Sequence, residues 1–275
     1  NNTLIIGNIV GRTRNGYYFG NARGIRVSSA NGTQIGGASA ADRNLVISNP
    51  NYGIGLLPGS SGTTIRNNHV GVDADGLTAR GNGNFGIVLE NADNNVVLGN
   101  LVSGNLGSGL YLYAGASGNL VDSNRIGTTA SGSAPLGNSS QGATISGLGS
   151  DANDLFANVV AYNGLEGVLV QGGSINNSIG APDDGNQIYA NGGDGIAIRD
   201  GSGHRIEGND LFANDEDEID LGDDGPTPND PGDVDTGPND LQNHPIIVST
   251  YTNLSQNMTQ VTVSLDSLPL RDYRV

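Results

Sequence analysis

Several residue types are absent from this sequence. The 275 residues include no Cys, no Trp and no Lys, and all 12 basic residues are Arg. The absence of Cys excludes a disulfide scaffold and a cysteine-ligated zinc site. The absence of Lys excludes a lysine Schiff base and a lysine general base. No apolar run approaches the ~18 residues that a membrane span requires, so we predict no transmembrane segment.

The charge balance restricts the partners of the chain. The 28 acidic residues outnumber the 12 arginines, and the formal net charge is -16 at pH 7. A surface that binds phosphate backbones needs clustered basic side chains. The sequence therefore predicts no nucleic-acid partner.

Glycine and asparagine are abundant instead. The chain contains 45 Gly and 35 Asn, and only 35% of its residues are hydrophobic. Such a composition alone is typical of a disordered chain. The polar residues recur at intervals, however, and this periodicity predicts a folded repeat protein. Because the pattern is already present at Asn1 with no signal peptide before it, we expect a segment of a longer precursor.

The main repeat is a glycine followed by an apolar-x-apolar triplet. Its copies begin 23 to 33 residues apart. They are Gly24–Val27, Gly53–Leu56, Gly86–Leu89, Gly109–Leu112, Gly142–Ile145, Gly167–Val170 and Gly195–Ile198, with a last copy, Glu218–Leu221, that has lost its glycine. The alternation indicates short strands with one buried face.

A second motif, Asn-x-apolar-x-x-Asn, lies between copies of the first. It is found at Asn44–Asn49, Asn100–Asn105, Asn158–Asn163, Asn186–Asn191 and Asn209–Asn214. Longer versions with an insert run over Asn8–Asn21, Asn68–Asn82 and Asn124–Asn138. The irregular spacings are thus regular turns plus inserts.

Strands this short are stable only when each turn of a coil stacks on the one before. Like strands then pair in parallel at ~4.8 Å. Asn suits the corners because it tolerates left-handed backbone, and stacked Asn side chains can form a hydrogen-bonded ladder. The sequence predicts about eight turns over residues 1–222.

This pattern resembles the right-handed parallel β-helix repeat family, which has the pectin-lyase-like fold. The most similar members are Gly/Asn-rich secreted bacterial surface proteins; others include pectate lyases, polygalacturonases, alginate epimerases and phage tailspikes. The resemblance covers roughly residues 2–245. It implies an all-β fold, an extracellular or cell-surface location in bacteria, and a polysaccharide as partner.

The composition changes after the last repeat. Residues 223–245 are acidic and rich in Pro and Gly, which predicts a loop that caps the open end of the coil. Residues 246–275 are rich in β-branched residues, and Arg271–Val275 could open a third strand. We expect this tail to be the start of a truncated β-sandwich domain.

The cap loop contains closely spaced oxygen ligands. Asp233, Asp235, Asn239 and Asp240 surround a glycine turn, and Asp230 comes just before them. Calcium prefers such ligand sets, so we predict calcium as the cofactor. The alternative is a solvated acidic cap without a metal.

Stacking predicts a second acidic group. The residues before three successive glycine positions are Glu166, Asp194 and Asp217, which would form one column ~4.8 Å apart. Asp220 and Arg199 would lie on the same side. These five residues are the candidate catalytic residues of a polysaccharide lyase or glycoside hydrolase. The alternative is an acid ladder neutralised by solvent or by a bound cation.

The same sheet offers a candidate binding strip. Tyr111 and Tyr113 point outward from one strand, and their flat rings suit sugars. Glu90 and Gln171 would lie beside them and offer hydrogen bonds to a polysaccharide. Cover by an inserted loop is the alternative.

The leading hypothesis is an extracellular polysaccharide-binding module that acts in adhesion or as a surface scaffold and is stabilised by calcium. The first alternative is a carbohydrate-active enzyme, which predicts a cleft walled by the inserts at 71–81 and 127–137. The second alternative is a stalk without a ligand. The fold alone does not choose between them.

Overall fold

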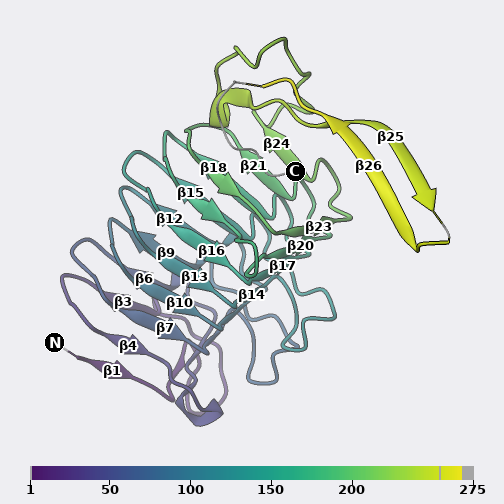
Figure 1. Cartoon of the computed structure of the whole chain (residues 1–275). Coiled ribbons are helices and arrows are strands. Elements are labelled where there is room, and N and C mark those ends of the chain that lie inside the picture. The colour runs from purple at the N-terminus through teal and green to yellow at the C-terminus, as the bar shows by residue number, and fades with distance from the viewer. Residues whose placement is uncertain (1, 254, 268–275) are drawn as a thin grey trace.

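The computed structural model describes residues 2–253 and 255–267. The chain winds into a coil in which each turn adds one strand to each of three parallel sheets (Figure 1). Neighbours within a sheet are therefore three strands apart in sequence, and each sheet has eight strands. This confirms the prediction of an all-β, right-handed parallel β-helix of about eight turns.

The first sheet contains the shortest strands. In spatial order they are β1 (Leu4–Ile5), β4 (Gln34–Ile35), β7 (Thr64–Arg66), β10 (Val96–Leu98), β13 (Leu120–Asp122), β16 (Asp154–Phe156), β19 (Ser178–Ile179) and β22 (Arg205–Ile206). In the chain, each of these strands follows a strand of the third sheet, so that β4 follows β3 and β7 follows β6. The exception is β1, which is the first strand of the coil.

The second sheet is separated from the first by a corner. Its strands are β2 (Ile9–Val10), β5 (Leu45–Val46), β8 (His69–Val70), β11 (Leu101–Val102), β14 (Arg125–Ile126), β17 (Val159–Ala161), β20 (Gln187–Tyr189) and β23 (Asp210–Phe212). These strands come from the segments that the Asn-x-apolar-x-x-Asn motif brackets.

The third sheet is built by the glycine-led repeat. Its strands are β3 (Ile25–Val27), β6 (Tyr52–Leu56), β9 (Phe85–Glu90), β12 (Ser108–Tyr113), β15 (Ala143–Ser146), β18 (Val168–Gln171), β21 (Ile196–Ile198) and β24 (Ile219–Leu221). The repeated glycine is required by space. At Gly86 a Cβ atom would lie 2.5 Å from Val102 Cγ1 and 2.6 Å from the Gly109 oxygen.

The core is a stack of aliphatic side chains along the axis of the coil. Ile54 pairs with Ile87, which pairs with Leu110, and all three are fully buried. Equivalent columns of Ile, Leu and Val come from the other two sheets. Each turn thus adds a thin apolar layer, which explains how a chain with 35% hydrophobic residues folds.

Three ladders of asparagine side chains run along the corners. The first contains Asn8, Asn44, Asn68, Asn100, Asn124, Asn158, Asn186 and Asn209. The second begins at the backbone N–H of Asn21 and continues through the side chains of Asn49, Asn82, Asn105, Asn138, Asn163, Asn191 and Asn214. The third contains Asn95, Asn119, Asn153 and Asn177.

Each rung satisfies the polar atoms of the next. The Nδ2 and backbone N–H groups of Asn100 both donate to Oδ1 of Asn124, at 3.0 and 2.9 Å. Nδ2 of Asn100 also donates to the Ile65 carbonyl at 2.9 Å. Because these amides are buried, the ladder satisfies groups that would otherwise be costly to remove from water.

The inserts leave the coil at the second sheet. Residues 71–81 and 127–137 pack against each other, and the Ala130 N–H donates to the Gly76 carbonyl at 3.0 Å. The Tyr189 hydroxyl donates to the Gly132 carbonyl at 3.1 Å. A shorter insert before β5 carries the 3-10 helix η1 (Ala40–Asp42). Both long inserts therefore cover the outward side of the second sheet.

The loop that follows β24 covers the C-terminal end of the coil and contains the 3-10 helix η2 (Pro238–Leu241). It continues the third asparagine ladder. His204 occupies the next rung, where its Nδ1 accepts from the Asn177 N–H at 3.3 Å. Asn239 of the loop then accepts from the His204 N–H at 2.8 Å and donates to its carbonyl at 3.2 Å.

The antiparallel hairpin of β25 (Ile246–Asn253) and β26 (Met258–Ser264) extends away from the coil (Figure 1, yellow). Ile247, Val248 and Tyr251 are exposed. The third strand expected at Arg271–Val275 lies outside the described residues. Within the described part of the chain, no helix has the length and apolarity of a membrane span.

Candidate functional site

The register of the third sheet arranges its outward side chains in three columns. The first column contains Arg23, Tyr52, Phe85, Ser108, Gln141, Glu166, Asp194 and Asp217. The second column contains Arg26, Gly55, Val88, Tyr111, Thr144, Leu169, Ala197 and Asp220. The third column contains Leu57, Glu90, Tyr113, Ser146, Gln171 and Arg199. We call this surface the outward face. It brings together all nine residues predicted as catalytic or substrate-binding.

Polar side chains of the first column form a continuous line of hydrogen bonds. Ser108 donates to Oε1 of Gln141 at 3.0 Å, and Nε2 of Gln141 donates to Oε2 of Glu166 at 3.0 Å. Oε1 of Glu166 accepts from Arg199 at 2.7 Å. Arg199 also pairs with Asp223. The line therefore fixes Glu166 and Arg199 in one orientation.

Aromatic rings occupy the middle of the outward face. Phe85 and Tyr111 stack with their centroids 4.7 Å apart and an interplanar angle of 17°. Tyr113 tilts against Tyr111 with a centroid distance of 5.0 Å. In the preceding turn, the ring of Tyr52 lies over Gly55, where a Cβ atom would come within 2.5 Å of it. These rings form a half-buried aromatic row.

The third column places hydrogen-bonding groups beside this row. Glu90 and Ser146 flank Tyr113 in the register, and Gln171 donates to the Ser146 hydroxyl at 3.5 Å. Burial, together with the Glu90 carboxylate, raises the pKa of Tyr113 to about 12. Tyr113 is therefore a neutral hydroxyl at physiological pH and can donate a hydrogen bond.

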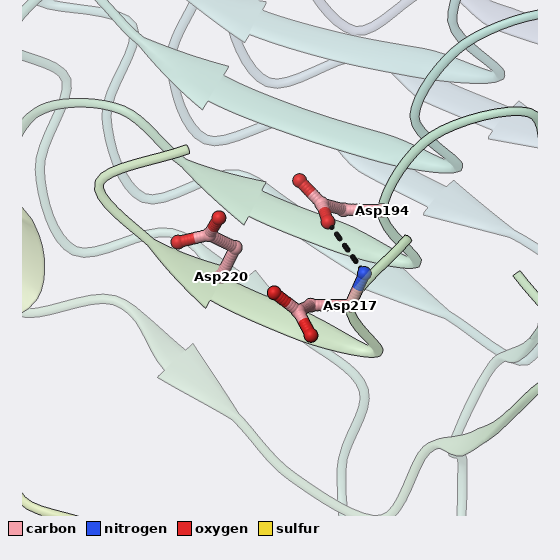
Figure 2. A group of neighbouring side chains, drawn as sticks. All are labelled: Asp194, Asp217 and Asp220. Carbon is pink, nitrogen blue, oxygen red and sulfur yellow. Dashed lines mark hydrogen bonds between the residues drawn. The ribbon is translucent and has the colours of Figure 1, made fainter. Parts of the chain in front are cut away.

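The outward face ends in an acidic pocket of about 390 Å³. It is lined by Asp194, Glu216, Asp217, Asp220, Asp223, Asp224 and Gly225. Carboxylate oxygens of Asp194, Asp217 and Asp220 lie within 4.8 Å of one another. Figure 2 shows these three side chains on the same side of the last strands. Such crowding favours either a shared proton or a bound cation.

Backbone N–H groups orient two of these carboxylates. Asp194 accepts from the Asp217 N–H at 2.8 Å (Figure 2). Asp220 accepts from the Asp223 and Gly225 N–H groups at 3.0 and 2.8 Å. Burial, together with the neighbouring Asp223 and Asp220 carboxylates, raises the pKa of Asp194 to about 7, although the hydrogen bond from the Asp217 N–H acts in the opposite direction. Asp194 therefore exchanges a proton near neutral pH.

Arg199 is held between two carboxylates at the edge of the acidic pocket. Its side chain pairs with Glu166 at 2.7 Å and with Asp223. Burial opposes the charge, but these carboxylates outweigh it and raise the pKa of Arg199. A guanidinium in this setting neutralises and positions the acids.

The predicted calcium ligands are divided between two places. Asp230, Asp233 and Asp235 place carboxylate oxygens within 4.8 Å of one another, and we call them the cap cluster. Oδ1 of Asp230 and Oδ1 of Asp235 are buried and have no hydrogen-bond partner among residues 2–253 and 255–267. Asn239 instead bonds to His204. Asp240 is exposed on η2.

The long inserts do not wall the acidic pocket. They cover the second sheet, whereas the pocket is bordered by the loop that follows β24. The enzyme hypothesis expected a cleft walled by these inserts. Among the described residues, neither insert lines the acidic pocket.

Sequence reasoning missed several residues of this site. Gln141 completes the line of the first column, and Asp223 and Asp224 line the pocket just after the last strand. The Gly-Asp-Asp-Gly run at 222–225 was the available signal. The stacking of Phe85 on Tyr111 joins the first column to the second, and it depends on side-chain rotation, which sequence spacing does not determine.

The family model of NosD, described as a periplasmic copper-binding protein, matches residues 1–131, slightly less than half of the chain. The chain is a right-handed parallel β-helix protein. The predicted extracellular or cell-surface location is consistent with the periplasmic description of that family. A search of curated proteins gives no significant match.

Solved structures of similar shape include two alginate-modifying proteins. The periplasmic alginate epimerase AlgG is 23% identical over 66% of this chain and 35% of its own, with a TM-score of 0.44. The A-module of the Azotobacter vinelandii mannuronan C-5 epimerase AlgE4 is 17% identical over 75% of this chain and 53% of its own, with a TM-score of 0.45. This chain thus spans about a third of the length of AlgG.

A surface adhesin also resembles the chain in shape. PfbA of Streptococcus pneumoniae is 13% identical over 90% of this chain and 67% of its own, with a TM-score of 0.38.

The copper in the NosD description does not fit the donors of this chain. Residues 1–131 contain no Cys, no Met and a single His, His69. Copper sites use imidazole, thiolate and thioether ligands, whereas clustered carboxylates suit calcium or magnesium. The acidic pocket and the cap cluster lie outside the matched residues, and both offer only oxygen donors.

Proposed function

We propose that the chain is an extracellular polysaccharide-binding module that binds a linear glycan along the outward face and acts in adhesion or as a surface scaffold. The aromatic row of Phe85, Tyr111 and Tyr113 carries this proposal. Flat aromatic rings pack against the apolar faces of sugars, and nearby hydroxyl and amide groups bind the sugar hydroxyls.

The layout of the outward face favours an extended ligand. Hydrogen-bonding side chains continue from Tyr113 through Ser146 and Gln171 to Arg199, one per turn. Groups that repeat at ~4.8 Å along a straight sheet can contact successive residues of a chain-like molecule. A stalk without a ligand would not need this continuity.

We infer that calcium binds at the two acidic clusters. In the acidic pocket, Asp194, Asp217 and Asp220 can supply hard oxygen ligands to one cation. In the cap cluster, buried oxygens of Asp230 and Asp235 have no partner within the described part of the chain, which supports a cation at this place. A divalent ion at either place would neutralise carboxylates that now repel one another.

The binding test is a panel of alginate, polygalacturonate and dextran in affinity electrophoresis with calcium present. We expect at least one polysaccharide to retard the protein, and Tyr111→Ala to weaken that affinity about tenfold. The matched control, Tyr251→Ala, removes an exposed tyrosine from the hairpin and should change nothing. Failure of all three polysaccharides to retard the wild type would favour the stalk.

A specific observation favours a second candidate function, a carbohydrate-active enzyme. Asp194 has a pKa of about 7, as a general acid requires, and two further carboxylates lie within 4.8 Å of it. Incubation with the same panel, scored for new reducing or unsaturated ends, tests this. Products that disappear in Asp194→Asn would establish catalysis, and their absence with every polymer would reject it.

A further inference from the structure

A second pocket lies on a different side of the coil, beneath the two long inserts. It has a volume of about 160 Å³ and lies at the corner between the first and second sheets. Arg43, Asn67, His69, Asp75 and Arg125 contribute its polar lining. At about 30 Å³ per water molecule, it has room for roughly five waters.

Two arginines converge on this pocket without acidic partners. Among the described residues, no carboxylate lies within ion-pair distance of Arg43 or Arg125, although acidic residues outnumber arginines 28 to 12. Arg80 and Arg199, in contrast, both pair with aspartates. Unpaired guanidinium groups facing one small pocket leave an uncompensated positive charge there.

Asp75 contributes a carboxylate to the lining of this pocket, and Asp73 lies in the same insert. Asp75 accepts from the Leu77 and Thr78 N–H groups of its own loop, at 2.8 and 3.2 Å. The Asp73 carboxylate binds Arg80 at 3.2 Å and the Tyr18 hydroxyl at 3.0 Å. Both carboxylates are therefore fixed by other donors.

Arg43 is oriented by the turn that contains Asn67. Its Nε and Nη2 atoms donate to the carbonyl and side-chain oxygens of Asn67, at 3.2 and 2.9 Å. His69 is held through Nδ1, 3.1 Å from the Asp73 carbonyl. Burial, and then the charge of Arg43, lowers the pKa of His69, so the positive charge of the pocket comes from the arginines.

Arg125 completes the pocket from two turns farther along. The register pairs His69 with Leu101 and Leu101 with Arg125, so one column of the second sheet carries all three. The inserts close over this column, because Ala130 of one binds Gly76 of the other. Arg43 and Arg125 therefore line the pocket from opposite ends, and the two inserts cover it.

We propose that this pocket binds a tetrahedral oxyanion, sulfate or phosphate, between the guanidinium groups of Arg43 and Arg125. Forked N–H donors match the oxygens of such anions, and a partly enclosed site strengthens each contact. The anion could be free or carried on a sugar as a sulfate ester. The site lies on the second sheet and is separate from the outward face.

The test is isothermal titration of the whole chain with sodium sulfate and sodium phosphate in a chloride buffer. We expect saturable binding that weakens at least tenfold in Arg125→Gln. The Arg125 side chain is exposed and makes no hydrogen bond to any residue that the structure describes, and its backbone bond to Asn100 is kept in glutamine, so this variant should fold normally. Arg14→Gln, which removes an exposed arginine from another loop, is the matched control and should bind as the wild type does.

Two further titrations, one with a sulfated disaccharide and one with both arginine variants, distinguish the source of the anion and test whether the pocket binds it. A sulfated disaccharide that binds at least tenfold tighter than sulfate would assign a sugar-borne group; equal affinities would assign the free ion. No saturable binding of sulfate, phosphate or the sulfated disaccharide would overturn the proposal. Binding that is unchanged in both Arg43→Gln and Arg125→Gln would also overturn it.

Discussion

The asparagine ladders and the outward face are built by the same stacking but differ in what they repeat. A ladder places the same residue at every turn, such as Asn100 above Asn124 above Asn158. The columns of the outward face change from turn to turn, from Phe85 through Gln141 to Asp194. Repetition satisfies buried amides and stabilises the coil, whereas variation along a column produces a site.

The contrast also explains where charge is tolerated. Inside the coil each ladder asparagine bonds to its copy in the next turn, and a neutral amide can both donate and accept in this way. On the outward face Glu166, Asp194 and Asp217 follow one another, and their mutual repulsion must be relieved by Arg199, by a proton or by a cation.

The largest expected effect comes from breaking a ladder in its middle. Asn124→Ala removes the acceptor of two buried donors on Asn100, so unfolding free energy should fall by about 3–5 kcal/mol. Urea denaturation measures this loss. Asn8→Ala at the exposed first rung should cost less than about 1 kcal/mol. Equal losses at both positions would contradict the role assigned to buried rungs.

Calcium should have the next largest effect. At 100 times its dissociation constant, a bound ion adds roughly 3 kcal/mol to the free energy of unfolding. We expect a higher melting temperature in calcium than in EDTA for the wild type. The gain should shrink in Asp230→Asn and in Asp220→Asn, one from each cluster. A melting temperature that calcium leaves unchanged would remove both sites.

The pH dependence of Asp194 should be somewhat smaller. Its pKa is about 7 in the fold but near its ordinary value in the unfolded chain, so the fold binds the extra proton. Stability is fully present below about pH 4 and is lost as pH rises through about 7. Asp194→Asn should therefore recover on the order of 2 kcal/mol at pH 8 without calcium. Thermal melts from pH 4 to 8 measure this difference. The same change of melting temperature with pH in the wild type and in Asp194→Asn would contradict the prediction.

The smallest effect is expected at His204, which takes the place of an asparagine in the third ladder. Burial lowers the pKa of His204, so its contribution to stability is present above about pH 6.5 and is lost as pH falls. Protonation of Nδ1 would also remove the acceptor used by Asn177. His204→Asn restores the ladder residue and should reduce the acid loss by about 1 kcal/mol. Thermal melts at acid pH measure this loss. An equal fall in melting temperature in the wild type and in His204→Asn would contradict the prediction.

The coil and its columns could be predicted because both follow from spacing. The glycine-led repeat fixes which residues pair, and one register then places Tyr111 and Asp194 on the same side. The alternation of apolar residues leaves no freedom in this step.

The fine structure of the two acidic clusters could not be predicted in the same way. Asp223 and Asn239 lie in a loop with no period, so their partners depend on three-dimensional fit. Asn239 was expected among the calcium ligands, and the structure places it on His204, as the rung of a further turn. The walls expected from residues 71–81 and 127–137 depended on which sheet the inserts cover, and sequence spacing does not determine this.

We propose that the asparagine ladders stabilise the coil while the outward face binds a glycan. The most direct measurement compares Asn124→Ala and Tyr111→Ala in urea denaturation and in affinity electrophoresis with the best polysaccharide of the panel. We predict that Asn124→Ala loses stability but keeps its affinity while folded, and that Tyr111→Ala loses about tenfold in affinity with little change in stability. Parallel loss of both properties in both variants, or an unchanged affinity in Tyr111→Ala, would show that stability and glycan binding are not divided between the ladders and the outward face.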